Sequence, residues 1–246
     1  MENVNVDEPI EDVLPQKREP MFNLPGSILA LGILLIIIHL IRYFLLTEPQ
    51  DQQVIFMFAF FPASFGDAAA SAPYPLSGYW SPLTHGLLHG DFLHLAMNLI
   101  WMAAFGSPVA QRFGAMRFFI LVIICTLAGA LLHFVTTSDP FVPVIGASGA
   151  VSGLMGAAAR FAFQNIGNRR GFTSDRPALS LVQSFQNRQF LMFFTIWMGM
   201  NYLFGAGFID VTGEGSLIAW QAHVGGFLAG ILIFGLLDPH KKQTTA

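Results

Sequence analysis

Four polar residues stand in otherwise apolar stretches of this sequence, and their types suit a hydrolytic site. Ser148 lies in the run Gly-Ala-Ser-Gly at 146–149, and His223 is followed by two glycines. A serine hydroxyl becomes a strong nucleophile when a neighbouring base takes its proton, and histidine, which titrates near neutrality, suits that role. His94 and Asn98 are four residues apart, so on a helix they share a face. The sequence therefore predicts Ser148 as nucleophile and His223 as general base.

An acyl-transfer site also needs hydrogen-bond donors for the oxyanion of its tetrahedral intermediate. The backbone N–H of Ser148, the imidazole of His94 and the side-chain amide of Asn98 are the candidate donors for this oxyanion hole. The acidic residues nearest to the histidine base, Asp210 and Glu214, precede it in a loop and lie too far along the chain to orient it. We therefore expect a Ser–His dyad and not a triad.

The composition indicates a membrane protein. The chain has 246 residues, of which 54% are hydrophobic and 11% charged, and its mean hydropathy is +0.57. Soluble domains average about 25% charged residues, so this chain has too little polar surface to remain dispersed in water. A net charge of -3 gives no reason to expect a nucleic-acid partner. We expect the lipid bilayer to cover the apolar surface.

Six apolar runs are read as membrane-crossing helices, since about 20 residues of helix span a bilayer core, although the second and fourth are shorter and hold polar residues. Backbone groups in lipid must be satisfied internally, which favours helices. The predicted fold class is therefore all-α, a polytopic bundle of six transmembrane helices. The six runs are 27–46, 92–106, 118–135, 147–163, 190–208 and 218–237.

The positive charges predict the orientation and the domain boundaries. The chain has twelve Lys and Arg, and with six spans and both termini inside, all except Arg42 fall on the cytoplasmic side. We expect Arg42 to snorkel to the outer interface. The predicted organisation is a disordered acidic cytoplasmic tail at 1–22, a membrane domain at 23–238 and a short cytoplasmic tail at 239–246. The bacterial inner membrane is the expected location.

Three of the predicted helices, 92–106, 147–163 and 218–237, enter the membrane from the outer face in this topology. Their polar residues then lie within roughly 10 Å of that face, because a helix rises 1.5 Å per residue. Small residues recur every four positions on the last two of these helices, a pattern that lets transmembrane backbones approach closely. We therefore expect these two helices to cross tightly. The small residues are Gly149, Gly153, Ala157, Ala222, Gly226 and Gly230.

These motifs resemble the signature of the rhomboid family of intramembrane serine proteases. The matching pieces are Gly-Ala-Ser-Gly at 146–149, Ala-His-Val-Gly-Gly at 222–226, and a histidine–asparagine series. That series has spacings of four, five and four residues; it is His85, His89, His94 and Asn98. The resemblance covers about 80–235, the whole predicted helical core.

The resemblance implies roles for these residues. Ser148 would be the nucleophile and His223 the base, with His94 and Asn98 lining the oxyanion hole. The family cleaves membrane-anchored proteins within or beside their transmembrane helix and uses no metal or cofactor. The resemblance also makes the fifth helix, with Phe193 and Trp197, and the loop after it the substrate gate. Loop 47–91 would be a partly membrane-embedded flap.

Two positions depart from the family pattern. Some members carry an aromatic residue one turn after the nucleophile that stacks on the catalytic histidine, and here that position is Ser152. Another residue must therefore hold His223. Many members have Trp-Arg in the first outer loop, whereas here Trp80 is followed by Ser81. Neither change removes a reacting group.

Three other interpretations compete with the protease. His85 and His89 have a spacing that could bind zinc, but no Cys or acidic ligand accompanies them in a span, so no metal site is expected. A transporter would need a polar path across the membrane, and the inner halves of the helices offer little of one. The remaining alternative is a proteolytically inactive rhomboid-like protein that binds membrane clients. Such a protein would be expected to lack the serine or the histidine, and both are present.

Overall fold

The structure is a computed structural model that describes residues 24–65, 69, 74–163, 177–205 and 219–240. Within these residues the regular elements are helical, joined by one isolated antiparallel bridge between Phe60 and Val144. The predicted all-α membrane fold is confirmed. The α-helices are α1 (Gly26–Leu45), α2 (Glu48–Phe58), α3 (Ser81–Thr84), α4 (Phe92–Trp101), α5 (Ser107–Thr136), α6 (Ser148–Ala162), α7 (Leu181–Gln186), α8 (Arg188–Gly205) and α9 (Trp220–Leu237). Shorter segments are the 3-10 turns η1 (Pro62–Ser64), η3 (Pro75–Tyr79) and η4 (His85–Leu87) and the π-helical η5 (Met102–Gly106).

Three described stretches are long and apolar enough to cross a membrane: Gly26–Leu45, Phe92–Thr136 and Trp220–Leu237. The second stretch holds α4, η5 and α5 in succession, and α5 has a non-helical residue at Gly114. It therefore covers two of the six predicted runs. The other two runs coincide with α6, of 15 residues, and α8, of 18 residues. Six helical runs are thus present, while the number of actual membrane crossings stays a prediction.

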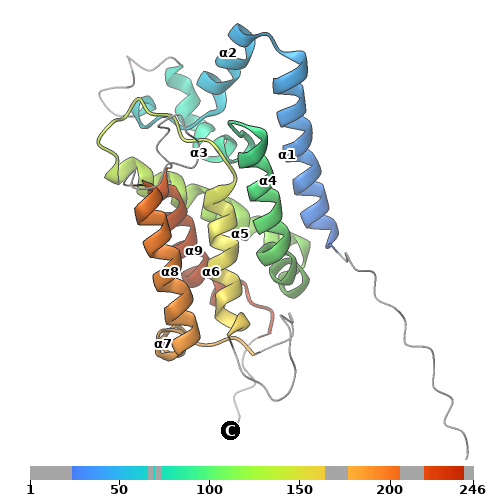
Figure 1. Cartoon of the computed structure of the whole chain (residues 1–246), viewed down its shortest axis with the longest axis vertical. Helices are drawn as coiled ribbons and strands as arrows, with labels where there is room; N and C mark the ends of the chain where they lie inside the picture. The colour runs from blue at the N-terminus through green and yellow to red at the C-terminus, as the bar shows by residue number, and fades with distance from the viewer. Residues whose placement is uncertain (1–23, 66–68, 70–73, 164–176, 206–218, 241–246) are drawn as a thin grey trace, which may run out of the picture.

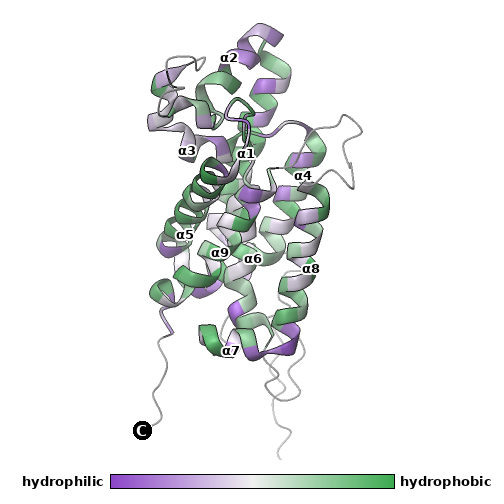
Figure 2. Cartoon of the chain, turned by 90° about the vertical axis from the view of Figure 1, so that its left-hand side faces the viewer, coloured by the Kyte–Doolittle hydropathy of each residue, from purple (hydrophilic) through white to green (hydrophobic). Residues whose placement is uncertain are grey.

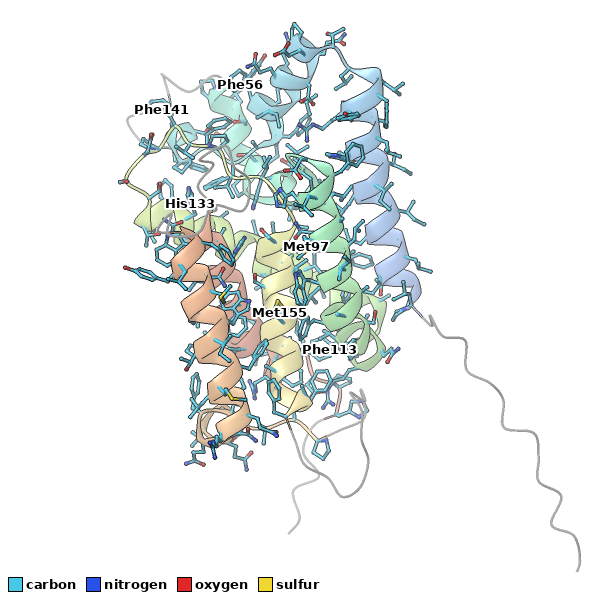
Figure 3. The ribbon with its side chains drawn as sticks, viewed as in Figure 1. Phe56, Met97, Phe113, His133, Phe141 and Met155 are labelled. Carbon is cyan, nitrogen blue, oxygen red and sulfur yellow. The ribbon has the colours of Figure 1, made fainter. Side chains whose placement is uncertain are left out.

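Helix α6 is the centre of the bundle. Its residues from Gly149 to Phe161 are all buried, mostly small ones that let neighbouring helices approach. It packs against α5 and α9, and Figure 1 shows it between α4 on one side and α8 on the other. Met155 of α6 and Met97 of α4 lie in the middle of the molecule, between Phe141 at one end and Phe113 at the other (Figure 3). The first residue of this central helix is Ser148.

The contact between α6 and α9 is made by glycine backbones. A Cβ atom added at Gly226 would collide with the carbonyl oxygen of Gly149, and one added at Gly230 would collide with that of Gly153. Only a residue without a side chain permits this approach, in the manner of small-residue stripes in transmembrane helices. The tight crossing predicted from the small residues is present.

Buried arginines fix the two ends of the bundle. At the end distant from Ser148, Arg112 pairs with Asp238 through two bonds of 2.9 and 2.8 Å, and both residues are buried. Near the other end, Arg42 of α1 bonds Asp51 of α2 at 2.7 Å and donates to the carbonyl of His89 at 2.7 Å. Arg42 is therefore a buried link between the first loop and α1, while its position relative to the membrane interface stays a prediction.

The apolar surface lies where lipid would cover it. Figure 2 shows hydrophobic residues along much of α5, whereas hydrophilic residues appear on α2 and close to α7. On α1, the outward side chains Ile33, Ile37 and Leu45 are 54%, 48% and 74% exposed. An exposed apolar face of this length marks contact with a membrane or a partner. Together with the spans, it indicates a multi-pass membrane protein.

Replacing Gly230 by alanine should destabilise the fold, because its methyl group would meet the backbone of Gly153 and force α6 and α9 apart. Overpacking of this kind costs about 1–3 kcal/mol. The thermal unfolding midpoint in detergent micelles measures the effect. Gly235→Ala on the same helix is the matched control, since nothing lies within 4 Å of a Cβ there and no loss is expected. Equal midpoints for the two variants would contradict the proposed role of the glycine contact.

Candidate active site

Ser148 and His223 meet at one end of the α6–α9 contact. The Oγ atom of Ser148 lies 2.7 Å from Nε2 of His223, a hydrogen-bond distance between residues that are 75 positions apart in sequence. Both side chains are half-buried. The contact follows from the glycine stripes, because each residue stands at the same end of its stripe and the helices cross there. The arrangement lets the imidazole accept the hydroxyl proton.

The second ring nitrogen of His223 has its own partner. Nδ1 lies 2.8 Å from Oδ1 of Asn201 on α8. Asn201 is itself buried, and its Nδ2 donates to the carbonyl of Trp197 at 2.8 Å. Sequence reasoning missed this residue, because it considered only acidic side chains as partners for the histidine. Asp210 and Glu214, which it did consider, lie outside the described residues.

The turn before Ser148 is built on Gly146. Its φ of +118° lies in the region that disfavours side chains, and a Cβ there would lie 2.7 Å from Nε2 of His94 and 3.6 Å from Oγ of Ser148. The imidazole of His94 and the Ser148 hydroxyl therefore face the same point beside Gly146. As the first residue of α6, Ser148 also has a backbone N–H with no intrahelical partner. The imidazole of His94 and the Ser148 N–H are thus two candidate donors close to the nucleophile.

The tautomer of His94 suits a donor role. The N–H of Gly90 points at Nδ1 of His94 at 3.5 Å, so Nδ1 is the accepting nitrogen and Nε2 carries the hydrogen. Asn98 is buried one turn further along α4, and its Nδ2 donates to the His94 carbonyl at 2.9 Å. An amide has two N–H hydrogens, so Asn98 has one more to donate. His94 thus faces the hydroxyl, whereas the bond of Asn98 to the His94 carbonyl runs back to its own helix.

The first loop supports the turn from the other side. The carbonyl of His85 accepts the Gly146 N–H at 2.9 Å, and Nε2 of His89 accepts the Ala147 N–H at 3.4 Å. Burial lowers the pKa of His89, in the loop between α3 and α4, to about 3, so the ring is neutral and can accept. Phe60 and Val144 exchange two backbone bonds, of 3.0 and 2.9 Å, in the bridge named above. The histidine series of the sequence thus shapes the backbone before the nucleophile.

No cluster of three or more potential metal ligands occurs in the part of the chain that the structure describes. His85 bonds the Ser81 carbonyl through Nδ1 at 3.0 Å, and the ring of His89 accepts the Ala147 N–H through Nε2 and lies edge-to-face against the ring of His94. The two histidines that could have suggested zinc by their spacing therefore make structural contacts.

The two predicted gate residues lie on α8 and pack on α9 through one aromatic residue. Trp197 stacks on Phe227 with ring centroids 4.2 Å apart and an interplanar angle of 14°, and the Phe193 ring lies 6.2 Å from Phe227. Phe193 also contacts Phe105 of η5. On α8 the buried side chains are Phe190 and Asn201. Most of this helix is therefore on the surface, held by aromatic contacts and by the bond of Asn201. The loop assigned to the gate lies almost wholly outside the described residues.

The chain matches the family description "Rhomboid domain" over residues 76–239. The matched region includes α3 to α9 and all the site residues named above. Because it exceeds half of the chain, the match decides the family.

Individual relatives agree with the match. The chain is 41% identical to RHOMBOID-like protein 5 of Arabidopsis thaliana over 78 residues. These aligned residues are 32% of this chain and 25% of that protein. It is 27% identical over 154 residues to Rhomboid protease GlpG of Serratia proteamaculans, covering 63% of this chain and 46% of the relative. Rhomboid protease GluP of Bacillus subtilis is 33% identical over 87 residues, which are 35% of this chain and 17% of GluP. The matches span less than half of each of these relatives. Fold, site geometry and sequence matches agree: this chain belongs to the rhomboid family.

Proposed function

We propose that this protein is an intramembrane serine endopeptidase that cleaves membrane-anchored proteins within or near their transmembrane helix. The observation that carries the proposal is the 2.7 Å contact between Oγ of Ser148 and Nε2 of His223. Family membership supports it, because two of the relatives are named rhomboid proteases. An inactive client-binding relative would have no need of a hydroxyl and an imidazole in this geometry.

Acylation begins when Oγ of Ser148 attacks the scissile carbonyl carbon and His223 Nε2 takes the hydroxyl proton. The carbonyl oxygen becomes an oxyanion in a tetrahedral intermediate. The intermediate collapses when the C–N bond breaks and the imidazolium gives its proton to the leaving nitrogen. Water, with the same histidine as base, then hydrolyses the ester and restores Ser148.

The oxyanion is stabilised by the donors around Gly146. Nε2 of His94 lies beside Gly146, Ser148 at the start of α6 has an N–H without an intrahelical partner, and Asn98 has one further amide hydrogen to complete the set. Removing one donor from such a site typically costs about 10²–10³ in kcat. In our proposal His94, Asn98 and the Ser148 amide form the oxyanion hole.

The substrates are transmembrane proteins that reach the site from the lipid. Helix α8 is the entrance we propose, with Phe193 and Trp197 as its gate, because this helix buries few side chains and is packed on α9 through separable aromatic rings. We place the termini in the cytoplasm and the Ser148 end of α6 near the outer face. Arg112 and Arg160 lie toward the other end of the bundle, as the positive-inside rule requires of that side.

A fluorophosphonate probe should label the wild-type protein covalently, and Ser148→Ala should abolish the labelling. Cleavage of a single-span substrate in detergent should fall by at least about a thousandfold, since removal of a serine nucleophile removes the covalent step. Gel fluorescence and mass spectrometry of the modified peptide measure the outcome.

Ser152→Ala is the matched control for this experiment. Ser152 is a buried serine one turn further along α6, so its replacement should leave the labelling intact. Equal labelling of the wild type and Ser148→Ala would refute the proposed nucleophile.

Cleavage should depend on pH through the protonation of His223. A protonated imidazole cannot accept the Ser148 proton, so below the pKa of the site the rate should fall about tenfold per pH unit. Initial cleavage rates from pH 4 to 8, with folding checked by circular dichroism at each pH, measure this fall in rate. A flat profile over the whole range would contradict the proposed base.

Gly146→Ala should lower the cleavage rate by roughly 10²–10³-fold, because its methyl group would occupy the point shared by His94 and Ser148. Gly114→Ala is the control, since Gly114 also has a positive φ, of 74°, but nothing within 4 Å of a Cβ. Both variants strain the backbone, and only the first obstructs the site. Similar rates per folded protein for the two variants would contradict the placement of the oxyanion hole beside Gly146.

A further inference from the structure

We propose that Asn201 on α8 is a positioning residue that holds the His223 imidazole in the orientation and tautomer needed to accept the Ser148 proton. This inference rests on the proposed function, because it gives His223 the role of base. Its starting point is the 2.8 Å contact between Nδ1 of His223 and Oδ1 of Asn201.

The orientation of the Asn201 amide follows from its second contact. Its Nδ2 lies 2.8 Å from the carbonyl oxygen of Trp197, one turn earlier on the same helix. A carbonyl accepts and cannot donate, so the nitrogen of the amide must face Trp197. With the amide reversed, two oxygen atoms would face each other there. Oδ1 therefore faces the imidazole, and it can only accept.

An accepting Oδ1 determines which nitrogen of His223 carries the hydrogen. Nδ1 must be the donor, so in the neutral ring Nε2 has the free lone pair. That lone pair faces Oγ of Ser148 at 2.7 Å. The same carbonyl dipole stabilises the imidazolium that forms when the proton arrives. Asn201 thus takes the place that a carboxylate occupies in a Ser-His-Asp site, without adding a charge.

Two further features support a role beyond packing. Asn201 is the polar member of the two side chains that α8 buries, and burying an amide in such a helix is unfavourable unless its groups are bonded. The position one turn after the nucleophile is Ser152, a buried serine with no ring to stack on the histidine. Within the described residues, the hydrogen bonds of the His223 ring are those with Ser148 and Asn201.

The simpler interpretation is that Asn201 only attaches α8 to α9. That attachment has other sources, because Trp197 stacks on Phe227 and Asn187 caps the start of α8, accepting the N–H groups of Gln189 and Phe190. A purely structural asparagine would affect stability and leave the acid–base behaviour of His223 unchanged. The two interpretations therefore differ in the pH profile.

The test compares Asn201→Ala, Asn201→Asp and the control Asn187→Ala in the full chain. Asn201→Ala should lower kcat roughly 10- to 100-fold, less than the roughly 10⁴-fold loss when a triad histidine is held in the wrong tautomer, and leave KM within about twofold. In Asn201→Ala the fall in rate at acid pH should begin at a lower pH than in the wild type, because the imidazolium loses a hydrogen-bond acceptor. In Asn201→Asp the fall in rate should begin at a pH higher by about one unit or more, because a carboxylate favours the imidazolium.

Asn187→Ala should change stability alone, with the wild-type pH profile. Among the described residues, His94 of α4 is the titratable group that acts on His223, and it is unchanged in all these variants. Shifts of opposite sign in Asn201→Ala and Asn201→Asp therefore report on His223. If the wild type is active and both Asn201 variants keep its pH dependence, the positioning role is overturned. The proposed protease activity would then still stand.

A readout without turnover separates the two claims. In protein labelled with ¹⁵N-histidine, the His223 signals, assigned by their loss in His223→Ala, should show hydrogen on Nδ1 in the wild type and a mixture of tautomers in Asn201→Ala. The same tautomer in both proteins would overturn the inference whatever the activity. Absence of fluorophosphonate labelling in the wild type would instead overturn the proposed function, and the tautomer measurement would still test the contact.

Discussion

The close approach of α6 and α9 is the constraint on which the site depends. Glycine faces glycine at two successive turns, and the carbonyl oxygens of Gly149 and Gly153 occupy the space that side chains at Gly226 and Gly230 would need. At the end of this contact the two helices carry Ser148 and His223. A larger residue on either stripe would increase the separation of the helices and lengthen the 2.7 Å bond between hydroxyl and imidazole. The packing of the bundle and the chemistry of the site are therefore one requirement.

Much of this arrangement was predictable because polar residues are conspicuous in apolar helices. Ser148, His223, His94 and Asn98 each interrupt an apolar run, and the small-residue stripes indicated which helices would meet. Asn201 interrupts its run in the same way, as the one amide within 190–208. It was missed because the search for a partner of the histidine admitted only carboxylates, although an amide oxygen can accept the same Nδ1–H.

Other parts of the site depend on contacts between distant segments, which no local pattern indicates. The positive φ of Gly146 is supported by a bond from its N–H to the His85 carbonyl, 61 positions away by numbering, and by the Phe60–Val144 bridge nearby. The bonds of Arg42 to Asp51 and to the His89 carbonyl could likewise not be predicted from its position near the end of a span. Local periodicity predicts elements, and these pairings arise only when the first loop folds onto the turn before α6.

The position of Asn201 constrains how a substrate could reach Ser148. The helix proposed as the entrance, α8, also carries Asn201, for which we propose the positioning role, and Trp197 lies only one turn before it. Moving all of α8 away from α9 would break both the Trp197–Phe227 stack and the bond to His223, leaving the imidazole free to rotate. Catalysis then requires either that the Asn201 end of α8 stays against α9 while the rest of the helix moves, or that this bond re-forms once the substrate is bound. In both cases the proposed dyad would be complete only when α8 is in place, so the proposed proton transfer would depend on the position of the proposed gate.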